Sequence, residues 1–191
     1  MTAPRVTRRT ILGGLATLGL GAHAAPLRPS PNAPSVWDLP GSWEDDAGAH
    51  VTLAEWASRP ALLTMAYGSC RRICSTSLRL LQQAQQEADA RGLSLSVIVV
   101  SLDPHVDTPA AWRQFRSEHR LERANWHFLD GAPAQVQRVA DLLEMKYWIY
   151  DDHVLHDLRI AAVSASGHIV ARVDWVDEPM RRLVDALQAQ G

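Results

Sequence analysis

The sequence predicts one α/β domain in which helices flank a central mixed sheet. Two observations lead to this prediction. From residue 61 onward, short apolar runs typical of strands alternate with segments of helical periodicity, which is the order found in partly parallel sheets. Near its end, the chain places two strand-like runs around a tight turn, and such a hairpin adds antiparallel strands to the sheet. The 191 residues contain no internal repeat that would indicate a second domain.

The predicted domain starts after a flexible lead-in. Residues 25–35 are rich in proline and small residues, which is typical of an extended linker. Two short strand candidates follow at residues 36–39 and 51–53, with a turn sequence at 45–48 between them. We therefore expect an N-terminal hairpin added to a domain that spans residues 36–191.

The middle of the chain alternates three predicted strands with three predicted helices. The strand candidates are dense in apolar residues, as expected of strands buried on both faces. Helix boundaries are indicated by a start at Asp107-Thr108-Pro109 and by a stop at Arg91-Gly92. In chain order we expect a strand at 61–67, a helix at 77–91, a strand at 93–102, a helix at 107–119, a strand at 126–129 and a helix at 133–143.

The last part of the predicted domain is a hairpin followed by a helix. Residues 159–164 and 168–174 alternate as half-buried strands do, and the turn sequence Ala165-Ser166-Gly167 joins them. Residues 177–188 place their apolar side chains on one helical stripe. This hairpin makes the predicted sheet mixed rather than parallel.

The N-terminus has the features of an export signal. Thr7 to Leu12 contains the pair Arg8-Arg9 and resembles a twin-arginine motif, and an uncharged apolar run follows at residues 11–20. Ala22-His23-Ala24 fits a signal-peptidase site, so residues 1–24 are expected to be removed. The apolar run is shorter than a membrane span, and no cysteine follows it that would carry a lipid. We expect a periplasmic protein exported by the twin-arginine route, with no transmembrane anchor after cleavage.

The charge of the chain excludes one class of partner. The formal net charge of the whole chain is −2, and removal of the signal takes away three arginines and no acidic residue. The mature chain is therefore acidic, whereas nucleic-acid-binding proteins cluster Lys and Arg. We expect no nucleic-acid partner.

Cys70 and Cys74 are the only two cysteines of the chain, and they lie between a predicted strand and a predicted helix. A four-residue step places two side chains on one helix face, and the helix start favours the thiolate form. Arg71 and Arg72 should lower the pKa values of both thiols further. Such a pair can form a redox-active disulfide or bind a soft metal ion. A purely structural disulfide is the third interpretation, but so small a loop adds little stability.

Four segments occur in the order and spacing of a known family. They are Tyr67-Gly68-Ser69-Cys70-x-x-x-Cys74, Ser101-Leu102-Asp103-Pro104-x-x-Asp107-Thr108-Pro109, Trp126-x-Phe128-Leu129-x-Gly131, and His156 placed 11 residues before Gly167. Together they resemble the Sco/SenC family of copper-binding assembly proteins, and the resemblance covers nearly all of the mature chain. It implies a thioredoxin-like fold.

The resemblance also implies a function and a metal site. It implies that Cys70, Cys74 and His156 bind one copper ion, and that the chain delivers copper to a respiratory cuproenzyme, such as a cytochrome oxidase subunit. A periplasmic copper donor would supply the ion. Thiolates suit Cu(I), and imidazole suits both copper states. Asp103 and Asp107 match acidic positions of the family, although a turn residue and a helix cap explain them equally well.

The histidine assignment has an alternative within the same segment. His153 lies three residues before His156, and only the spacing to Gly167 favours His156. Asp157 or Asp152 is a candidate acceptor that would orient a ligand imidazole.

The chain departs from the family pattern at two places. The family usually has proline after both cysteines, where this chain has Arg71 and Ser75. The common Asp-His-Ser sequence reads Leu155-His156-Asp157 here. Neither difference removes a proposed copper ligand, so copper binding remains the expectation.

A thiol–disulfide oxidoreductase acting on a client's cysteines is the main alternative function. Thioredoxin-type enzymes separate their cysteines by two residues and keep a cis-proline opposite them, whereas residues 156–160 contain no proline. A peroxidase of the peroxiredoxin type would need Thr or Ser where Tyr67 stands. A binding domain with an inert disulfide remains a further alternative.

The chain contains seven tryptophans, and most of them are expected in the core or at strand edges. Trp148 lies just before the histidine segment, so a partner surface is its alternative role. Core packing is the simpler expectation for it.

Overall fold

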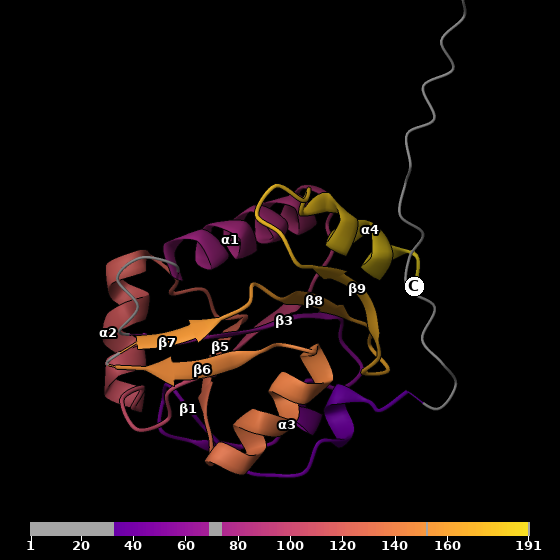
Figure 1. Cartoon of the computed structure of the whole chain (residues 1–191). Helices are drawn as coiled ribbons and strands as arrows, with labels where there is room; N and C mark the ends of the chain where they lie inside the picture. The colour runs from indigo at the N-terminus through magenta and orange to yellow at the C-terminus, as the bar shows by residue number, and fades with distance from the viewer. Residues whose placement is uncertain (1–32, 69–73, 152, 191) are drawn as a thin grey trace, which may run out of the picture.

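The described residues form one mixed sheet with helices on both faces. The computed structural model describes residues 33–68, 74–151 and 153–190. Within these ranges, seven strands pair in the order β2-β1-β5-β4-β3-β8-β9, and β6 and β7 form a separate hairpin (Figure 1). In chain order the elements are η1 Val36–Asp38, β1 Trp43–Asp45, β2 His50–Val51, η2 Leu53–Trp56, β3 Ala61–Ala66, α1 Cys74–Ala90, β4 Ser96–Ser101, α2 Pro109–His119, β5 Trp126–Asp130, α3 Pro133–Leu143, β6 Tyr147–Tyr150, β7 His153–His156, β8 Ile160–Val163, β9 Ile169–Val173 and α4 Arg181–Gln188.

The sheet is parallel in the middle and antiparallel at both sides, as predicted. β4 pairs in parallel with β3 and with β5. β8 runs antiparallel to β3, and β9 continues the antiparallel pairing, so the closing hairpin is confirmed. The carboxyl ends of the three parallel strands therefore meet at one edge of the sheet, which is where polar residues after strands gather in α/β folds.

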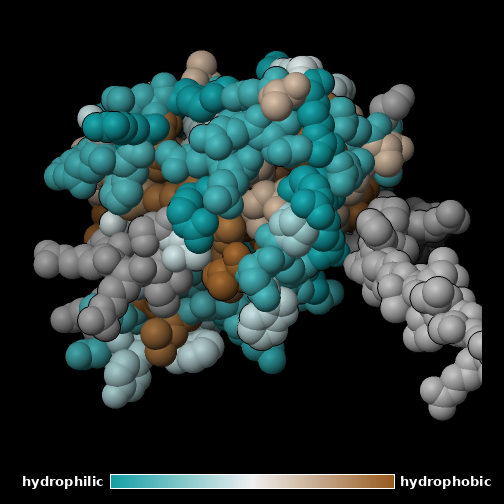
Figure 2. Space-filling model, turned by 90° about the horizontal axis from the view of Figure 1, so that it is seen from above, coloured by the Kyte–Doolittle hydropathy of each residue, from teal (hydrophilic) through white to brown (hydrophobic). Residues whose placement is uncertain are grey.

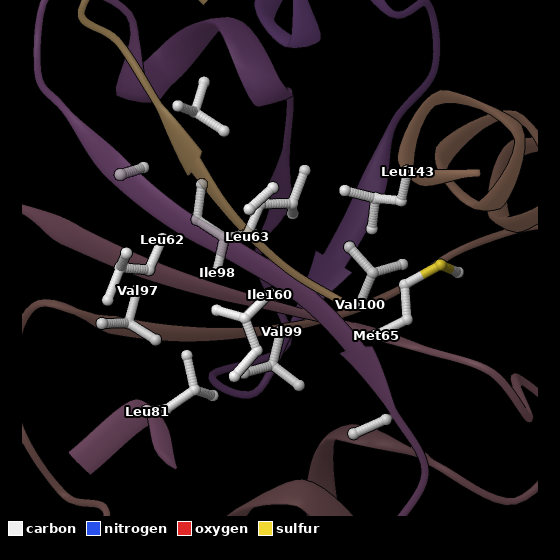
Figure 3. Packing of buried hydrophobic residues seen from close by; sticks show 14 of the residues in the cluster. Leu62, Leu63, Met65, Leu81, Val97, Ile98, Val99, Val100, Leu143 and Ile160 are labelled. Carbon is white, nitrogen blue, oxygen red and sulfur yellow. The ribbon is translucent and has the colours of Figure 1, made fainter. Parts of the chain in front are cut away.

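The two faces of the sheet are covered by different helices. α1 and α4 lie side by side on one face, and α3 lies on the other (Figure 1). Side chains of one strand alternate between these layers. Figure 3 shows Val97 beside Leu81 of α1, whereas Val100 and Met65 point toward Leu143 of α3. The apolar runs of β3 and β4 thus fill two cores at once, which explains why they are buried along their whole length.

Helix α2 begins at the predicted Thr-Pro signal. The Thr108 side chain accepts a hydrogen bond from the Ala111 N–H at 3.3 Å, and Pro109 occupies the first turn. On the buried side of α2, the Trp112 ring packs against the Phe128 ring of β5, with 5.1 Å between the ring centroids. Thr108 rather than Asp107 caps the helix, so Asp107 has a different role.

The predicted N-terminal hairpin exists, but its strands lie elsewhere. Residues 36–39 were expected to be a strand, whereas Val36–Asp38 form the short helix η1. The N–H of Val36 donates to the carbonyl of Gly167 at 2.8 Å, and the indole N–H of Trp37 donates to the carbonyl of Ala165 at 3.1 Å. The segment is therefore held by the β8–β9 turn and not by strand pairing. The expected strand at 51–53 is also wrong, because β2 ends at Val51 and the short helix η2 begins at Leu53.

The β6–β7 hairpin was not predicted. Its strands have four residues each, and the Tyr150 and Ile149 side chains are exposed. Trp148 is 53% exposed, so the expectation that it packs in the core is wrong. Trp175 is exposed as well, whereas the other five tryptophans are buried, as expected.

Two helix boundaries also differ from the prediction. α1 begins at Cys74, three residues before the expected start, and α4 begins at Arg181, four residues after it. The residues before α4 form a turn in which the Glu178 side chain accepts hydrogen bonds from the N–H groups of Asp174 and Trp175. None of the described helices is long and apolar enough to cross a membrane.

Candidate metal centre

The predicted thiol site starts where strand β3 leaves the sheet. β3 carries the chain to Tyr67 and Gly68, and α1 begins at Cys74, so the predicted strand-to-helix junction is present. Cys70, Arg71 and Arg72 lie outside the described residues, as does the side chain of Cys74. The predicted export signal at residues 1–24 lies outside them too.

His156 ends strand β7 with one ring nitrogen free for a ligand. Its Nδ1 lies 2.8 Å from the carbonyl oxygen of Asp157, and this contact requires a proton on Nδ1. In the neutral ring, Nε2 then carries a lone pair. Nε2 is buried and has no hydrogen-bond partner among the described residues. Burial also lowers the pKa of His156, which favours the neutral form that metals bind.

The structure brings His156 next to Tyr67, the residue that follows β3. The ring of Tyr67 stands edge-on to the imidazole of His156, with 6.0 Å between ring centroids and 83° between planes. Tyr67 precedes Cys70 by three residues in the sequence. His156 therefore lies against Tyr67 just beyond the carboxyl end of β3, although the two residues are far apart along the chain.

His153 occupies the other face of the hairpin strand. Along β7, Val154 is buried and His156 is half-buried, while His153 and Leu155 are exposed. Because side chains alternate along a strand, His153 points away from the side that His156 occupies. The geometry thus favours His156 over His153 as the ligand candidate.

The acceptor that orients His156 is a backbone group. Asp157 contacts the imidazole through its carbonyl oxygen, while its carboxylate accepts from the Lys146 N–H at 3.2 Å and forms an ion pair with Arg159. The expected carboxylate acceptor is therefore replaced by a carbonyl at Asp157. Asp152, the other candidate, lies outside the described residues.

The two acidic residues after β4 differ in their surroundings. Asp103 is a turn residue, as expected, because its carbonyl accepts from the N–H groups of Val106 and Asp107. Asp107 is only 1% exposed, and its carboxylate bonds the Gly68 N–H and the Ser101 hydroxyl. Burial raises the pKa of Asp107 to about 6. Sequence reasoning had no signal for this burial, because Asp before Thr-Pro reads as a cap.

The described ranges alone contain no group of three His, Cys, Asp or Glu side chains arranged to hold a metal ion. The expected site needs Cys70 and the side chain of Cys74, which lie outside those ranges. The three-ligand site therefore stays a prediction, supported on its imidazole side by the free Nε2 of His156.

The family follows from a comparison with known proteins. The model of the SCO1/SenC family matches residues 40–189, which include the whole sheet and both halves of the candidate site. The chain belongs to the SCO1/SenC family. No curated protein matches it.

Solved structures of Sco proteins share the fold. Copper-bound ScoI of Arabidopsis thaliana is 22% identical with a TM-score of 0.68, over 79% of this chain and 95% of that one. Copper-bound ScoI of Bradyrhizobium japonicum is 21% identical with a TM-score of 0.63, over 78% and 96%. BsSco, described with a disulfide switch as a member of the Sco family of cytochrome c oxidase assembly proteins, is 19% identical with a TM-score of 0.72, over 83% and 95%. These matches confirm the thioredoxin-like fold.

Proposed function

We propose that this SCO1/SenC chain is a periplasmic copper-binding protein that delivers copper to a respiratory cuproenzyme, namely the copper centre of cytochrome c oxidase. Cys70, Cys74 and His156 are the proposed ligands. The observation that carries the proposal is the buried Nε2 of His156, which has no partner among the described residues. The imidazole contacts Tyr67, which precedes Cys70 by three residues in the sequence. A buried polar atom without a partner is costly, and a metal ion removes that cost.

The donor set suits a copper carrier. Two thiolates are soft ligands for Cu(I), and the imidazole suits Cu(II) as well. The ligands bind only when both sulfurs are reduced, so oxidation to a disulfide would release the ion. Relatives solved with copper bound support this choice of metal.

The test is an anaerobic Cu(I) titration of the reduced protein against a competing chromophoric chelator. We expect one tight equivalent in the parent protein and its loss in Cys70→Ala and Cys74→Ala. Equal affinity in the parent and the two cysteine variants would refute the site. Transfer of copper to an isolated oxidase copper domain then tests the client.

The thiol–disulfide oxidoreductase remains the second candidate. In the sequence, the cysteine pair follows β3 and ends at Cys74, the first residue of α1. This position favours the oxidoreductase, as does the disulfide switch named for BsSco. Against it, every peptide bond in the described ranges is trans, so they hold no cis-proline of the thioredoxin type. A reduced parent protein that binds no copper but reduces a client disulfide would select this function.

The periplasmic location rests on the N-terminal sequence and has its own test. Changing Arg8 and Arg9 together to Lys should keep the protein in the cytoplasm, because twin-arginine export reads the arginine pair. Cell fractionation with an antibody against the chain measures this. Unchanged periplasmic recovery would contradict the proposed route.

A further inference from the structure

A buried carboxylate holds the chain just before the thiol segment. The N–H of Gly68 donates to Oδ1 of Asp107 at 2.8 Å, and the hydroxyl of Ser101 donates to Oδ2 at 2.6 Å. The Ser101 oxygen in turn accepts from the Asp103 N–H at 2.9 Å. One carboxylate thus joins the end of β3, the end of β4 and the loop before α2.

Burial of the Asp107 carboxylate is unfavourable enough to need an explanation. Burial of a carboxylate is strongly unfavourable unless a cation or hydrogen bonds compensate it. Within the described ranges, no ion pair involves Asp107, and only these hydrogen bonds favour its charged form. An uncharged amide could link the same backbone segments without burial of a charge.

Gly68 is fitted to this contact from the other side. A Cβ at Gly68 would lie 3.0 Å from Oδ1 of Asp107 and 3.6 Å from the Trp112 ring. The backbone of Gly68 has no positive φ, so its lack of a side chain serves the close approach and not an unusual conformation. A residue with a side chain at position 68 would therefore crowd the hydrogen bond between the Gly68 N–H and the Asp107 carboxylate.

We propose that Asp107 is a positioning residue for the copper-binding thiols, because its hold on the Gly68 N–H fixes where the chain enters the segment with Cys70. This inference rests on the proposed copper site. Cys70 is two residues beyond Gly68, and metal affinity depends on how the groups around a ligand orient it. A shift at Gly68 is therefore expected to reach the thiol.

The experiment compares variants that break or keep the Gly68 contact. Asp107→Leu removes the acceptor and keeps the branching of the side chain, whereas Asp107→Asn keeps an oxygen for the Gly68 N–H. Ser101→Ala removes the other partner of the carboxylate and leaves the Gly68 contact in place. Leu187→Ala deletes buried volume at the end of α4 that lies near Arg91, at the opposite end of α1 from Cys74, and so controls for lost stability alone.

Two readouts are taken for each variant. The first is the anaerobic Cu(I) titration, in which loss of a group that orients a ligand typically weakens affinity about 10- to 100-fold. The second uses metal-free protein and measures the equilibrium between the Cys70–Cys74 dithiol and its disulfide in a glutathione buffer. Circular dichroism melting shows whether each variant is folded.

The expected result is at least a tenfold loss of Cu(I) affinity in Asp107→Leu, with Asp107→Asn, Ser101→Ala and Leu187→Ala within about threefold of the parent. Parental affinity in Asp107→Leu, or an equal loss in Leu187→Ala, would overturn the inference. If Asp107→Leu does not fold, Gly68→Ala replaces it, since the added Cβ displaces the same contact. Parental affinity in that variant overturns the inference as well.

The metal-free readout separates this inference from the proposed function. If the parent binds no Cu(I), the copper function fails and the dithiol equilibrium decides. A tenfold shift in Asp107→Leu that Asp107→Asn does not show would then support positioning by Asp107. Equal dithiol equilibria in the parent and both variants would overturn it.

Discussion

The ring of Tyr67 stands edge-on against the imidazole of His156, with the centroids 6.0 Å apart. Tyr67 follows the last residue of the central strand β3, and His156 ends the hairpin strand β7. Together with the hydrogen bond from Nδ1 to the Asp157 carbonyl, this contact fixes the imidazole with its free nitrogen buried. The histidine is thus oriented before any metal binds.

Replacement of Tyr67 should therefore alter the Cu(II) site. Tyr67→Ala removes the ring that supports His156, and we expect Cu(II) affinity to fall about tenfold or more. Tyr67→Phe keeps the ring and serves as the control. Visible absorption and electron paramagnetic resonance of the Cu(II) form would measure the change. Identical Cu(II) spectra and affinities for Tyr67→Ala and Tyr67→Phe would show that the ring contact is not needed.

The two histidines of the β6–β7 hairpin should behave differently. His156→Ala is expected to weaken copper binding and to change the Cu(II) spectrum more than the Cu(I) affinity, because two thiolates alone still suit Cu(I). His153→Ala, the matched control on the exposed face of β7, should leave both unchanged. If His153→Ala lost the Cu(II) spectrum instead, the ligand assignment would be reversed.

Asp107 should make the stability of the metal-free protein depend on pH. Its pKa is 3.8 when unperturbed and about 6 in the folded chain, so between these values the folded state binds more protons. The free energy of unfolding should therefore fall as pH rises from about 4 to 6, by about 3 kcal/mol at most. Asp107→Asn lacks this dependence.

Urea unfolding of the parent and Asp107→Asn between pH 4 and pH 7 measures the effect. The lowered pKa values of His127 and His156 act in the opposite direction, because stability from a neutral histidine is lost as pH falls through about 6.5. Both histidines are present in both proteins, so their contribution cancels in the difference. Parallel stability curves for the two proteins would contradict the prediction.

Two tryptophans should differ strongly in their contribution to stability. Trp112 is fully buried against Phe115 and Phe128, so Trp112→Ala should cost about 3–5 kcal/mol. Trp148 is exposed, and Trp148→Ala should change stability by no more than about 0.5 kcal/mol. Chemical unfolding at pH 7 tests both. A loss above 2 kcal/mol in Trp148→Ala would mean that the hairpin packs more tightly than the structure shows.

Gly167, in the β8–β9 turn, should not tolerate replacement by a residue with a side chain. Its φ is +87°, and an added Cβ would lie 2.0 Å from the Ser35 hydroxyl oxygen and 2.6 Å from the Trp37 ring. Gly167→Ala should therefore cost well over 2 kcal/mol and detach the η1 segment. Gly92→Ala is the control, since Gly92 also has a positive φ but nothing lies within 4 Å of its Cβ position. Similar melting temperatures for the two variants would contradict this reasoning.

The elements that sequence reasoning located well are those with a strong local signal. β3 and β4 are continuous apolar runs, and α2 starts at a Thr-Pro pair, so burial and capping chemistry identify them directly. Val36–Asp38 carries a strand-like composition, but its backbone bonds go to the distant Gly167 turn. The sequence around residues 36–38 gives no sign of this distant partner, so the prediction of a strand in place of η1 was wrong.

The hairpin was missed for a related reason. Its turn has no glycine, and Asp151 instead adopts a positive φ of 57°, which aspartate tolerates better than most residues. The first strand reads Tyr-Trp-Ile-Tyr, which shows no alternation of polar and apolar residues, and its last three side chains are exposed. For the site, the spacing to Gly167 identified His156 as the candidate, but its burial, the Tyr67 contact and the carboxylate of Asp107 depend on tertiary packing.

In the proposed site, the placement of His156 makes complete metal binding depend on a late step of folding. The hydroxyl of Thr64 in β3 donates to the carbonyl of Arg159 at 2.6 Å, and β8 follows directly beside β3. The imidazole therefore arrives only when the late strands have docked on the early ones, whereas the two cysteines come from a single short stretch of chain. A partly folded molecule would present the two cysteine thiolates without the His156 imidazole. It would therefore bind Cu(I) but only weakly bind Cu(II). Comparing uptake of the two ions during refolding would reveal this order as a delay in the Cu(II) signal.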